Sequence, residues 1–135
     1  MELNIRRLKE SDWKSLIEWW KAWPNWEPLP KEYMPDNGLG GLMVEKNDTL
    51  IVAGFIYFTN SKGALLEWIV SNPEYKDKDR KEAIELLIIG AEQVCKAQGV
   101  KYIFSIGRNK SLIETHRKLN WVIDDSPSHE MVKNL

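Results

Sequence analysis

The sequence has little cysteine, no long hydrophobic run and no excess of either charge. Its 135 residues include one cysteine, Cys95, which excludes an intramolecular disulfide and a metal site built from several cysteines. A reducing compartment fits this composition. No stretch approaches the roughly 18 apolar residues that a membrane-spanning helix needs, and the N-terminus, MELNIRRLKESD, lacks the apolar core of a signal peptide. We therefore expect a cytoplasmic protein without a membrane partner and without a metal site.

The charge balance argues against nucleic acid as a partner. Lysine and arginine number 19 and aspartate and glutamate 20, which gives a net charge of −1, whereas domains that bind nucleic acid are usually basic. Hydrophobic residues make up 43% of the chain and charged residues 29%, which is ordinary for a globular protein with a core. The length predicts a single domain over residues 1–135.

Glycine is missing from a loop where a phosphate site would use it. Residues 72–87, NPEYKDKDRKEAIELL, are typical of a strand end, a short loop and the start of a helix, and every residue of 76–82 is charged. Glycine in such loops lets backbone amides approach a phosphate. The sequence also offers a capping box, with Asp79 as N-cap and Glu82 three residues later. In that case the Asp79 carboxylate would occupy the amides that a phosphate needs, and the sequence leaves both interpretations open.

The apolar periodicity predicts an α/β (α+β) domain with a mixed central sheet of about six to seven strands flanked by about four helices. In the first helix, Trp13, Leu16, Ile17 and Trp20 follow the i, i+3, i+4, i+7 spacing of one buried face. The predicted helices are 11–23, 80–98 (ended by Gly99) and 110–119, with one short turn near 30–34. The predicted strands are 3–8, 41–46, 50–59, 64–71, 101–107, one beginning near Trp121, and 129–135.

Two segments in this order of elements resemble the GNAT superfamily of acyl-CoA-dependent N-acetyltransferases. VSNPEYKDKDRKEAIELL (70–87) lies where the family has a strand end, a turn and the pyrophosphate loop that opens a helix. NKSLIETHRKLNW (109–121) is similar, position for position, to the family pattern Asn-x-x-Ala-x-x-Leu-Tyr-Glu-Lys-Leu-Gly-Phe. The sequence departs from the family at Asp79 and Lys81, which replace small residues, so it resembles a short phage-type member with a degenerate pyrophosphate loop.

The resemblance implies transfer of an acetyl group from acetyl-CoA to a primary amine of a small molecule or a protein. Backbone groups of a strand end would bind the pantetheine chain, and a loop with the following helix would bind the pyrophosphate. The residues at the family's cofactor positions are Ile69, Val70, Ser71, Lys76, Lys78, Asp79, Arg80, Lys81 and Asn109. As the N-cap of a helix, Asn109 would also be explained without a cofactor.

Two residues are candidates for the chemistry. His116 stands where many relatives have the tyrosine that protonates the leaving thiolate, and a neutral imidazole could still donate one proton. It also falls on the apolar stripe formed with Leu112, Ile113 and Leu119, where it would need no catalytic role. Glu67 is an acidic residue in an otherwise apolar strand, where burial could raise its pKa and suit it as a base. The alternative is that Glu67 faces outward or pairs with a lysine.

The acceptor site is the least defined part. Trp19, Trp23 and Trp26 fall outside the buried stripe of the first helix, and with Glu27 they would form an aromatic and acidic wall suited to a cationic amine. A homodimer surface or further core would use the same tryptophans.

A second function class also fits the sequence. A catalytically inactive GNAT-fold binding or scaffold protein that has lost acyl-CoA would keep the same fold. The two classes differ at residues 76–81, which form either a concavity lined by amides or a helix start closed by Asp79.

Overall fold

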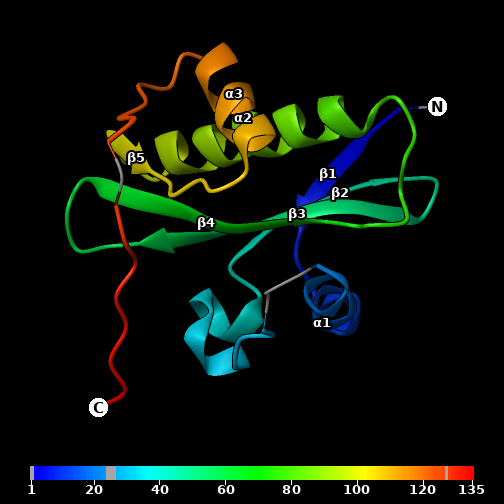
Figure 1. Cartoon of the computed structure of the whole chain (residues 1–135), viewed down its shortest axis with the longest axis horizontal. Helices are drawn as coiled ribbons and strands as arrows, with labels where there is room; N and C mark the ends of the chain where they lie inside the picture. The colour runs from blue at the N-terminus through cyan, green and yellow to red at the C-terminus, as the bar shows by residue number, and fades with distance from the viewer. Residues whose placement is uncertain (1, 24–26, 127) are drawn as a thin grey trace.

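A mixed β-sheet runs through the middle of the protein (Figure 1). The computed structural model describes residues 2–23, 27–126 and 128–135, and within them one five-stranded sheet has its strands in chain order. The strands are β1 (Asn4–Arg7), β2 (Gly41–Lys46), β3 (Thr49–Phe58), β4 (Gly63–Ser71) and β5 (Tyr102–Phe104). Neighbouring strands are antiparallel except β4 and β5, which are parallel. The crossover between β4 and β5 contains a helix, as a parallel connection requires.

Helices cover both faces of the sheet. The helices α2 (Arg80–Ala97) and α3 (Lys110–Lys118) lie on one face, and α1 (Trp13–Ala22) lies on the other with the 3-10 turns Lys31–Tyr33 and Pro35–Gly38 (Figure 1). None of the helices in the described part of the chain is long and apolar enough to span a membrane.

The two covered faces explain the composition of the central strands. Val52 and Ile56 of β3 pack in the core under α2, while Ala53 and Phe55 pack in a second core with Trp20 of α1. Because side chains alternate between the faces of a strand, β3 is apolar at nearly every position rather than at every second one. Comparison of the element bounds also confirms the predicted helix and strand positions up to residue 119 to within a few residues.

The beginning of α1 is fixed by a buried ion pair. Asp12 is the N-cap residue of α1 but makes no side-chain capping bond to that helix. Its carboxylate instead accepts two hydrogen bonds from the Arg6 guanidinium, both at 2.8 Å, and one from the backbone N–H of Lys9 at 2.9 Å. Arg6 also donates to Glu45 at 2.6 Å. This network ties β1, β2 and the first turn of α1 together at the end of the sheet opposite β5.

The two strands predicted after α3 are absent from the described residues, so the sheet has fewer strands than expected. Local contacts hold residues 121–126 elsewhere: Trp121 donates from Nε1 to Glu92 at 2.9 Å, and Ser126 N–H donates to the Asp124 side chain in a turn. With three residues, β5 also offers only a short ladder to a further strand. After Ile123 the chain turns polar, with DDSPSHE at 124–130, so the apolar residues near Trp121 do not continue as an alternating strand pattern.

Candidate active site

A cleft forms where β4 and β5 part. Their ladder ends at the pair Leu65 and Phe104, although β4 continues to Ser71. At this point β4 contains a β-bulge, because Ala53 and Phe55 of β3 pair with Val70 and Glu67, which leaves one extra residue on β4. A bulge bends its strand and redirects its backbone groups. The strand end that the sequence predicts to bind a pantetheine chain therefore turns away from β5 and borders an open space.

The bulge holds Trp68 in a left-handed conformation. Its φ is 58°, which is unusual for a bulky residue and costs on the order of 1–3 kcal/mol. The indole Nε1 donates to the Tyr57 hydroxyl at 2.8 Å, and the ring packs edge-on against Tyr33 at 6.1 Å between centroids. Because strain of this kind persists only where neighbours enforce it, these aromatic contacts maintain the bulge. Nothing in the sequence around Trp68 signals it.

The space between β4, α2 and α3, called the main cleft from here on, has a volume of about 550 Å³. It brings together most of the residues that the sequence assigns to a cofactor, which come from three separate segments. Its lining is Trp23, Val52, Ile69, Val70, Ser71, Asp77, Lys78, Arg80, Lys81, Ile84, Asn109, Ser111, Leu112 and Thr115. A cleft of this size falls within the range of small-molecule sites.

The start of α2 opens onto the main cleft. Asp79 is the N-cap residue but makes no side-chain capping bond, so the predicted capping box is wrong. Lys46 Nζ donates to Asp79 Oδ2 at 2.8 Å, and the Tyr75 hydroxyl donates to Oδ1 at 2.6 Å. The carboxylate is thus held away from the helix. Among the described residues, no acceptor is found for the backbone N–H groups of Lys81 and Glu82. A helix start with free amides is a site for an anion.

The contacts of Asp79 also set the ionisation of this group. The hydrogen bond from Lys46, followed by that from Tyr75, lowers the pKa of Asp79 below its usual range. The same carboxylate raises the pKa of Tyr75 to about 12. The Asp79 side chain is therefore a carboxylate at neutral pH, with two partners that compete against any return to the helix amides.

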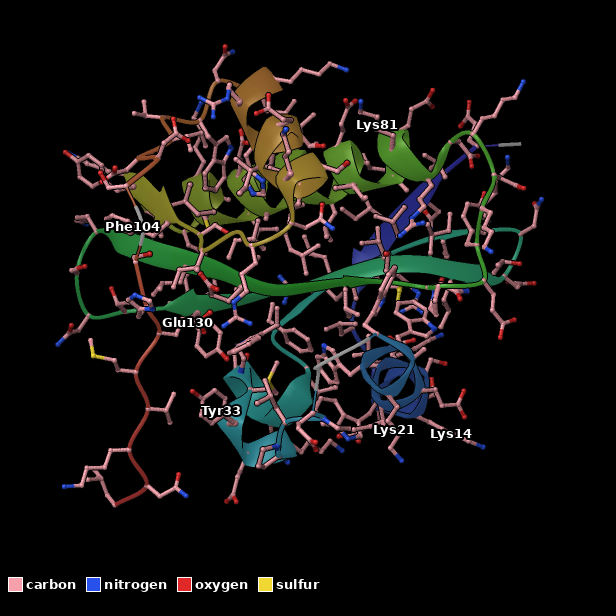
Figure 2. The ribbon with its side chains drawn as sticks, in the orientation of Figure 1. Lys14, Lys21, Tyr33, Lys81, Phe104 and Glu130 are labelled. Carbon is pink, nitrogen blue, oxygen red and sulfur yellow. The ribbon has the colours of Figure 1, made fainter. Side chains whose placement is uncertain are left out.

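Three cationic side chains line the main cleft beside this helix start. Lys78, Arg80 and Lys81 are among the lining residues, whereas Lys76 is exposed and is not. In Figure 2, Lys81 projects from the first turn of α2. Arg80 Nη2 donates to Ser71 Oγ at 2.7 Å, and its guanidinium lies 5.9 Å from the centroid of the Trp23 ring. Of the four basic residues that the sequence assigns to the cofactor in this loop, Lys78, Arg80 and Lys81 thus border the cleft and Lys76 does not.

Glu67 lies at a second, smaller cavity next to the main cleft. This Glu67 cavity measures about 70 Å³, shares Ile69, Asn109 and Leu112 with the main cleft, and is also lined by Arg108 and Glu130. The backbone N–H of Ile106 donates to Glu67 Oε1 at 2.9 Å across the gap between β4 and β5. Burial raises the pKa of Glu67 to about 7, against the opposing effects of the Ile106 N–H and Arg108. The carboxyl group thus lies in the buried setting that the sequence suggested, and its role as a base stays a prediction.

His116 does not reach the cleft. Its side chain is buried, its Nδ1 donates to the carbonyl of Leu112 at 2.8 Å, and its ring packs edge-on against Trp121 with centroids 4.7 Å apart. Thr115, one position earlier, lines the main cleft instead. A one-residue change turns a helix by about 100°, so the resemblance placed the right helix at the cleft with the wrong side chain. The predicted acid role of His116 is therefore not supported by its position.

Asn109 starts α3 as a cap. Its side-chain oxygen accepts from the backbone N–H groups of Ser111 at 2.8 Å and Leu112 at 3.2 Å. Asn109 also borders both cavities. The capping interpretation is confirmed, and a cofactor contact by the same residue stays a prediction.

The residues predicted to form the acceptor wall lie in different parts of the structure. Trp19 is buried in the core with Trp20, so it belongs to the core alternative. Trp23 lines the main cleft and donates from Nε1 to the carbonyl of Ser71 at 3.2 Å. Glu27 is exposed, and Trp26 lies outside the described residues. Trp68 lines the Glu67 cavity instead and donates to the Tyr57 hydroxyl, and sequence reasoning missed both residues.

Several of the solved structures that share this fold are acetyltransferases. No protein-family model and no curated protein matches the sequence. The PaiA N-acetyltransferase from Thermoplasma acidophilum, in complex with coenzyme A, superposes with a TM-score of 0.68 at 19% identity, covering 94% of each chain.

Two further enzymes give similar values. The ribosomal-protein-S18-alanine N-acetyltransferase from Escherichia coli has a TM-score of 0.69 at 14% identity, over 87% of this chain and 76% of that one. An aminoglycoside acetyltransferase from an uncultured soil metagenomic sample, in complex with sisomicin, has a TM-score of 0.66 at 14% identity, over 98% and 97%. At these identities the likeness shows a shared fold, and the phage-type resemblance stays a prediction.

Proposed function

This chain has the GNAT fold, as its sequence predicts, and we propose that it is an N-acetyltransferase that moves an acetyl group from acetyl-CoA to a primary amine. The acceptor is a small molecule or an amine of a protein. The buried free thiol of Cys95 fits the cytoplasmic location expected from the sequence.

The observation that carries the proposal is the open start of α2. Sequence reasoning set a choice between a helix start closed by Asp79 and a concavity lined by amides, and Asp79 is held outside by Lys46 and Tyr75. Among the described residues, the N–H groups of Lys81 and Glu82 at this helix start have no acceptor. The cleft beside them is lined by three cationic side chains against one carboxylate, Asp77. That combination of amides and positive charge suits a pyrophosphate.

The residues of the main cleft fit coenzyme A without glycines. Lys78, Arg80 and Lys81 would hold the phosphates, and the strand end Ile69–Ser71 would hold the pantetheine chain through its backbone. Bound acetyl-CoA supplies an acetyl group activated as a thioester. The coenzyme A complex of the PaiA N-acetyltransferase supports this ligand, and sisomicin in the aminoglycoside acetyltransferase supports an amine acceptor.

Glu67 is placed to accept a proton from the acceptor. An ammonium group must lose a proton before its nitrogen can attack a carbonyl, and a base with a pKa near the working pH does this best. The pKa of Glu67 is about 7, and its carboxylate lies in a cavity that shares Ile69, Asn109 and Leu112 with the main cleft. An alkyl thiol such as that of cysteine has a pKa of about 8.5, so a thiolate can leave without a strong acid and then take up a proton from water, and the reaction does not depend on His116.

Calorimetric titration with acetyl-CoA tests the proposal. We expect saturable binding of acetyl-CoA and of desulfo-CoA, and a loss of affinity of about tenfold or more when Lys78 and Lys81 are both changed to alanine, since each contact between a charged group and phosphate contributes about 1.5–3 kcal/mol. The matched control is Lys76→Ala, in the same loop but outside the cleft, which should bind as the parent does. Absence of binding heat and of thermal stabilisation at saturating ligand would exclude the enzyme function.

One observation favours a cofactor-free binding protein as the second candidate. Trp23 already occupies part of the main cleft, with Nε1 on the Ser71 carbonyl and its ring against Arg80, and Asp77 lines the space that a phosphate would enter. If these contacts are permanent, the cleft is filled by its own side chains. The same titration decides: a Trp23→Ala variant that gains acetyl-CoA binding absent in the parent would favour this candidate.

A further inference from the structure

Glu67 and Trp68 are neighbours in β4, yet both lie on the same face of the sheet. Successive side chains of a strand normally point to opposite faces. Glu67 pairs with Phe55 of the core beneath α1, and Trp68 packs against that same core. The bulge, in which Trp68 has a φ of 58°, adds the residue that breaks the alternation. It therefore brings an acidic and an aromatic residue together at the Glu67 cavity, which both of them line.

The Trp68 ring is held in place through its polar edge. Its Nε1 donates to the Tyr57 hydroxyl at 2.8 Å, and that hydroxyl donates to the carbonyl of Tyr33 at 3.3 Å. Figure 2 shows Tyr33 on the side of the sheet away from α2 and α3. Because the indole N–H already has an acceptor, the group that Trp68 offers to a ligand is its π system, which attracts cations. Strained backbone of this kind is typical of binding and catalytic sites.

Glu67 sets the charge of the cavity. Arg108 lines the same cavity, but its guanidinium is ion-paired with Glu130, so these two charges offset each other. Glu67 Oε1 accepts from the Ile106 N–H, and among the described residues no partner is found for Oε2. An ammonium group at Oε2 would add a hydrogen bond strengthened by opposite charges. The cavity is therefore suited to a cation.

The Glu67 cavity admits only a narrow group. Its volume is about 70 Å³, and a water molecule takes about 30 Å³ in the liquid. An ammonium group on an unbranched methylene carbon fits this space. A nitrogen on a branched carbon, such as the α-amino group of an amino acid or a peptide, brings more atoms than the cavity holds.

We propose that Glu67 and Trp68 bind the acceptor as an ammonium ion on an unbranched methylene carbon, between the Glu67 carboxylate and the Trp68 ring. The acceptor enters from the side of α1, while acetyl-CoA occupies the main cleft between β4, α2 and α3. This inference rests on the proposed N-acetyltransferase function, because it names the acceptor of that reaction. It selects aliphatic amines and lysine side chains, and it excludes α-amino groups.

Titration followed by nuclear magnetic resonance tests the site on the isotope-labelled full chain, without acetyl-CoA. The reporters are the backbone N–H of Ile106, which donates to Glu67, and the indole N–H of Trp68. Above the Glu67 pKa of about 7, the carboxyl group is mostly ionised, while an alkylammonium ion is still protonated, as lysine is up to a pKa of about 10.4. We expect both signals to shift saturably with n-butylammonium. The neutral n-butanol and the branched tert-butylammonium should bind about tenfold or more weakly.

Variants test each partner, with the Ile106 signal as the common reporter. Glu67→Gln removes the negative charge and should weaken n-butylammonium binding by about tenfold. Trp68→Leu should weaken it by about fivefold and Trp68→Phe by less, because phenylalanine keeps a π face. The matched control is Glu32→Gln, which changes an exposed carboxylate next to Tyr33 but outside the lining of the cavity. This control should bind n-butylammonium as the parent does.

The comparison of ligands on the parent needs no variant to fold. No shift with n-butylammonium overturns the proposal, and so does equal affinity for n-butanol or for tert-butylammonium. Undiminished binding in a folded Glu67→Gln or Trp68→Leu variant overturns it as well. An acetylated lysine amide, which presents only its side-chain amine, distinguishes the two sources of this group. Affinity equal to that of n-butylammonium assigns lysine side chains of proteins, and weaker binding assigns small aliphatic amines.

Failure of this site and failure of the proposed activity give different results. If acetyl-CoA binds and n-butylammonium does not, the acceptor site is wrong and the proposed activity stands. If n-butylammonium binds and acetyl-CoA does not, the protein has a cation site without the proposed activity, and the acceptor role of that site is overturned.

Discussion

The two helices that border the main cleft begin in opposite ways. At the start of α3, Asn109 turns its side-chain oxygen onto the backbone N–H groups of Ser111 and Leu112. At the start of α2, Asp79 turns its carboxylate away, to Lys46 and Tyr75. A side-chain cap contributes about 1 kcal/mol, so α2 gives up a stabilising contact that its sequence could make. The difference indicates a division of roles, with α3 as scaffold and α2 as the helix that keeps its amides for a ligand.

If α3 is only scaffold, the base must come from elsewhere, and the proposed base is Glu67 of β4. We expect Glu67→Gln to lower kcat by about a hundredfold or more, the usual scale for losing a general base, while KM for acetyl-CoA changes little. His116→Phe should keep kcat, because the ring is packed against Trp121 away from the cleft. Steady-state kinetics with a panel of amines measures both. A large loss of kcat in His116→Phe, with the protein still folded, would return the acid role to α3.

The pH dependence of the rate separates a base from a merely structural carboxyl group. Glu67 must be ionised to accept a proton, and its pKa is about 7, so kcat should rise as the pH rises through about 7 and then level off. Glu67→Gln should flatten this rise. A parent profile that is flat between pH 6 and 8 (roughly one unit either side of the pKa) would argue against Glu67 as the base.

The start of α2 should become capped like that of α3 if Asp79 loses the two partners that hold its carboxylate away from the helix. In the double variant Lys46→Met with Tyr75→Phe, both outward partners are lost, and the carboxylate can turn onto the amides of Lys81 and Glu82 as Asn109 does on α3. We expect affinity for acetyl-CoA to fall by about tenfold, which corresponds to about 1.4 kcal/mol, with little loss of thermal stability. Titration calorimetry measures the fall. Adding Asp79→Ala to the double variant should restore binding, and failure to restore it would mean that capping was not the cause.

Much of the scaffold follows from the sequence because its signals are local. Apolar side chains at period two or at the helical spacing give the strands and helices up to residue 119, and Gly99 ends α2 with φ of +81°, a conformation that glycine adopts without cost. The Asn109 cap is also local, since its partners are two and three residues away. Each of these features needs only neighbours in the chain.

The features that were missed depend on residues far apart. Asp79 looked like a cap because its competitor Lys46 lies 33 residues away, and no local pattern reports that contact. The Trp68 bulge depends on Tyr57 and Tyr33, on other segments. The strands expected after Trp121 are absent from the described residues, where Trp121 instead contacts Glu92, 29 residues away. Sequence patterns therefore located the cleft, while the orientation of its side chains was set by tertiary contacts.

Stability should distinguish a true cap from a false one. Asn109→Ala removes two hydrogen bonds to the start of α3 and should lower the free energy of unfolding by about 1 kcal/mol. Asp79→Ala is made in a Tyr75→Phe background, which has already lost the hydrogen bond from Tyr75 to Asp79. There it removes no capping bond and only a partly exposed ion pair with Lys46, and because surface ion pairs contribute little its effect should be smaller. Urea denaturation of both variants measures the difference. Equal losses would mean that Asp79 caps α2 in solution.

The smallest expected effect is the pH dependence of stability that comes from Asp79 and Glu67, because their pKa values are shifted in opposite directions. Lys46 lowers the pKa of Asp79 from its ordinary 3.8, so the stability that Asp79 contributes is present above that pH and is lost as the pH falls through its folded pKa. Burial raises the pKa of Glu67 from 4.5 to about 7, so the folded state binds the extra proton between these values and stability falls as the pH rises across them.

Melting temperatures measured against pH should show these opposite slopes. Glu67→Gln should gain stability over the parent as the pH rises from about 4.5 to about 7 and keep that gain above it, because the variant avoids an ionised group in a desolvated cavity. Asp79→Asn should be less stable than the parent at neutral pH and should approach it in acid, where Asp79 becomes protonated. If the melting temperatures of the two variants changed with pH in parallel, the two carboxyl groups would share one environment. The proposed difference between Asp79 at the ligand-binding start of α2 and Glu67 as the base on β4 would then be wrong.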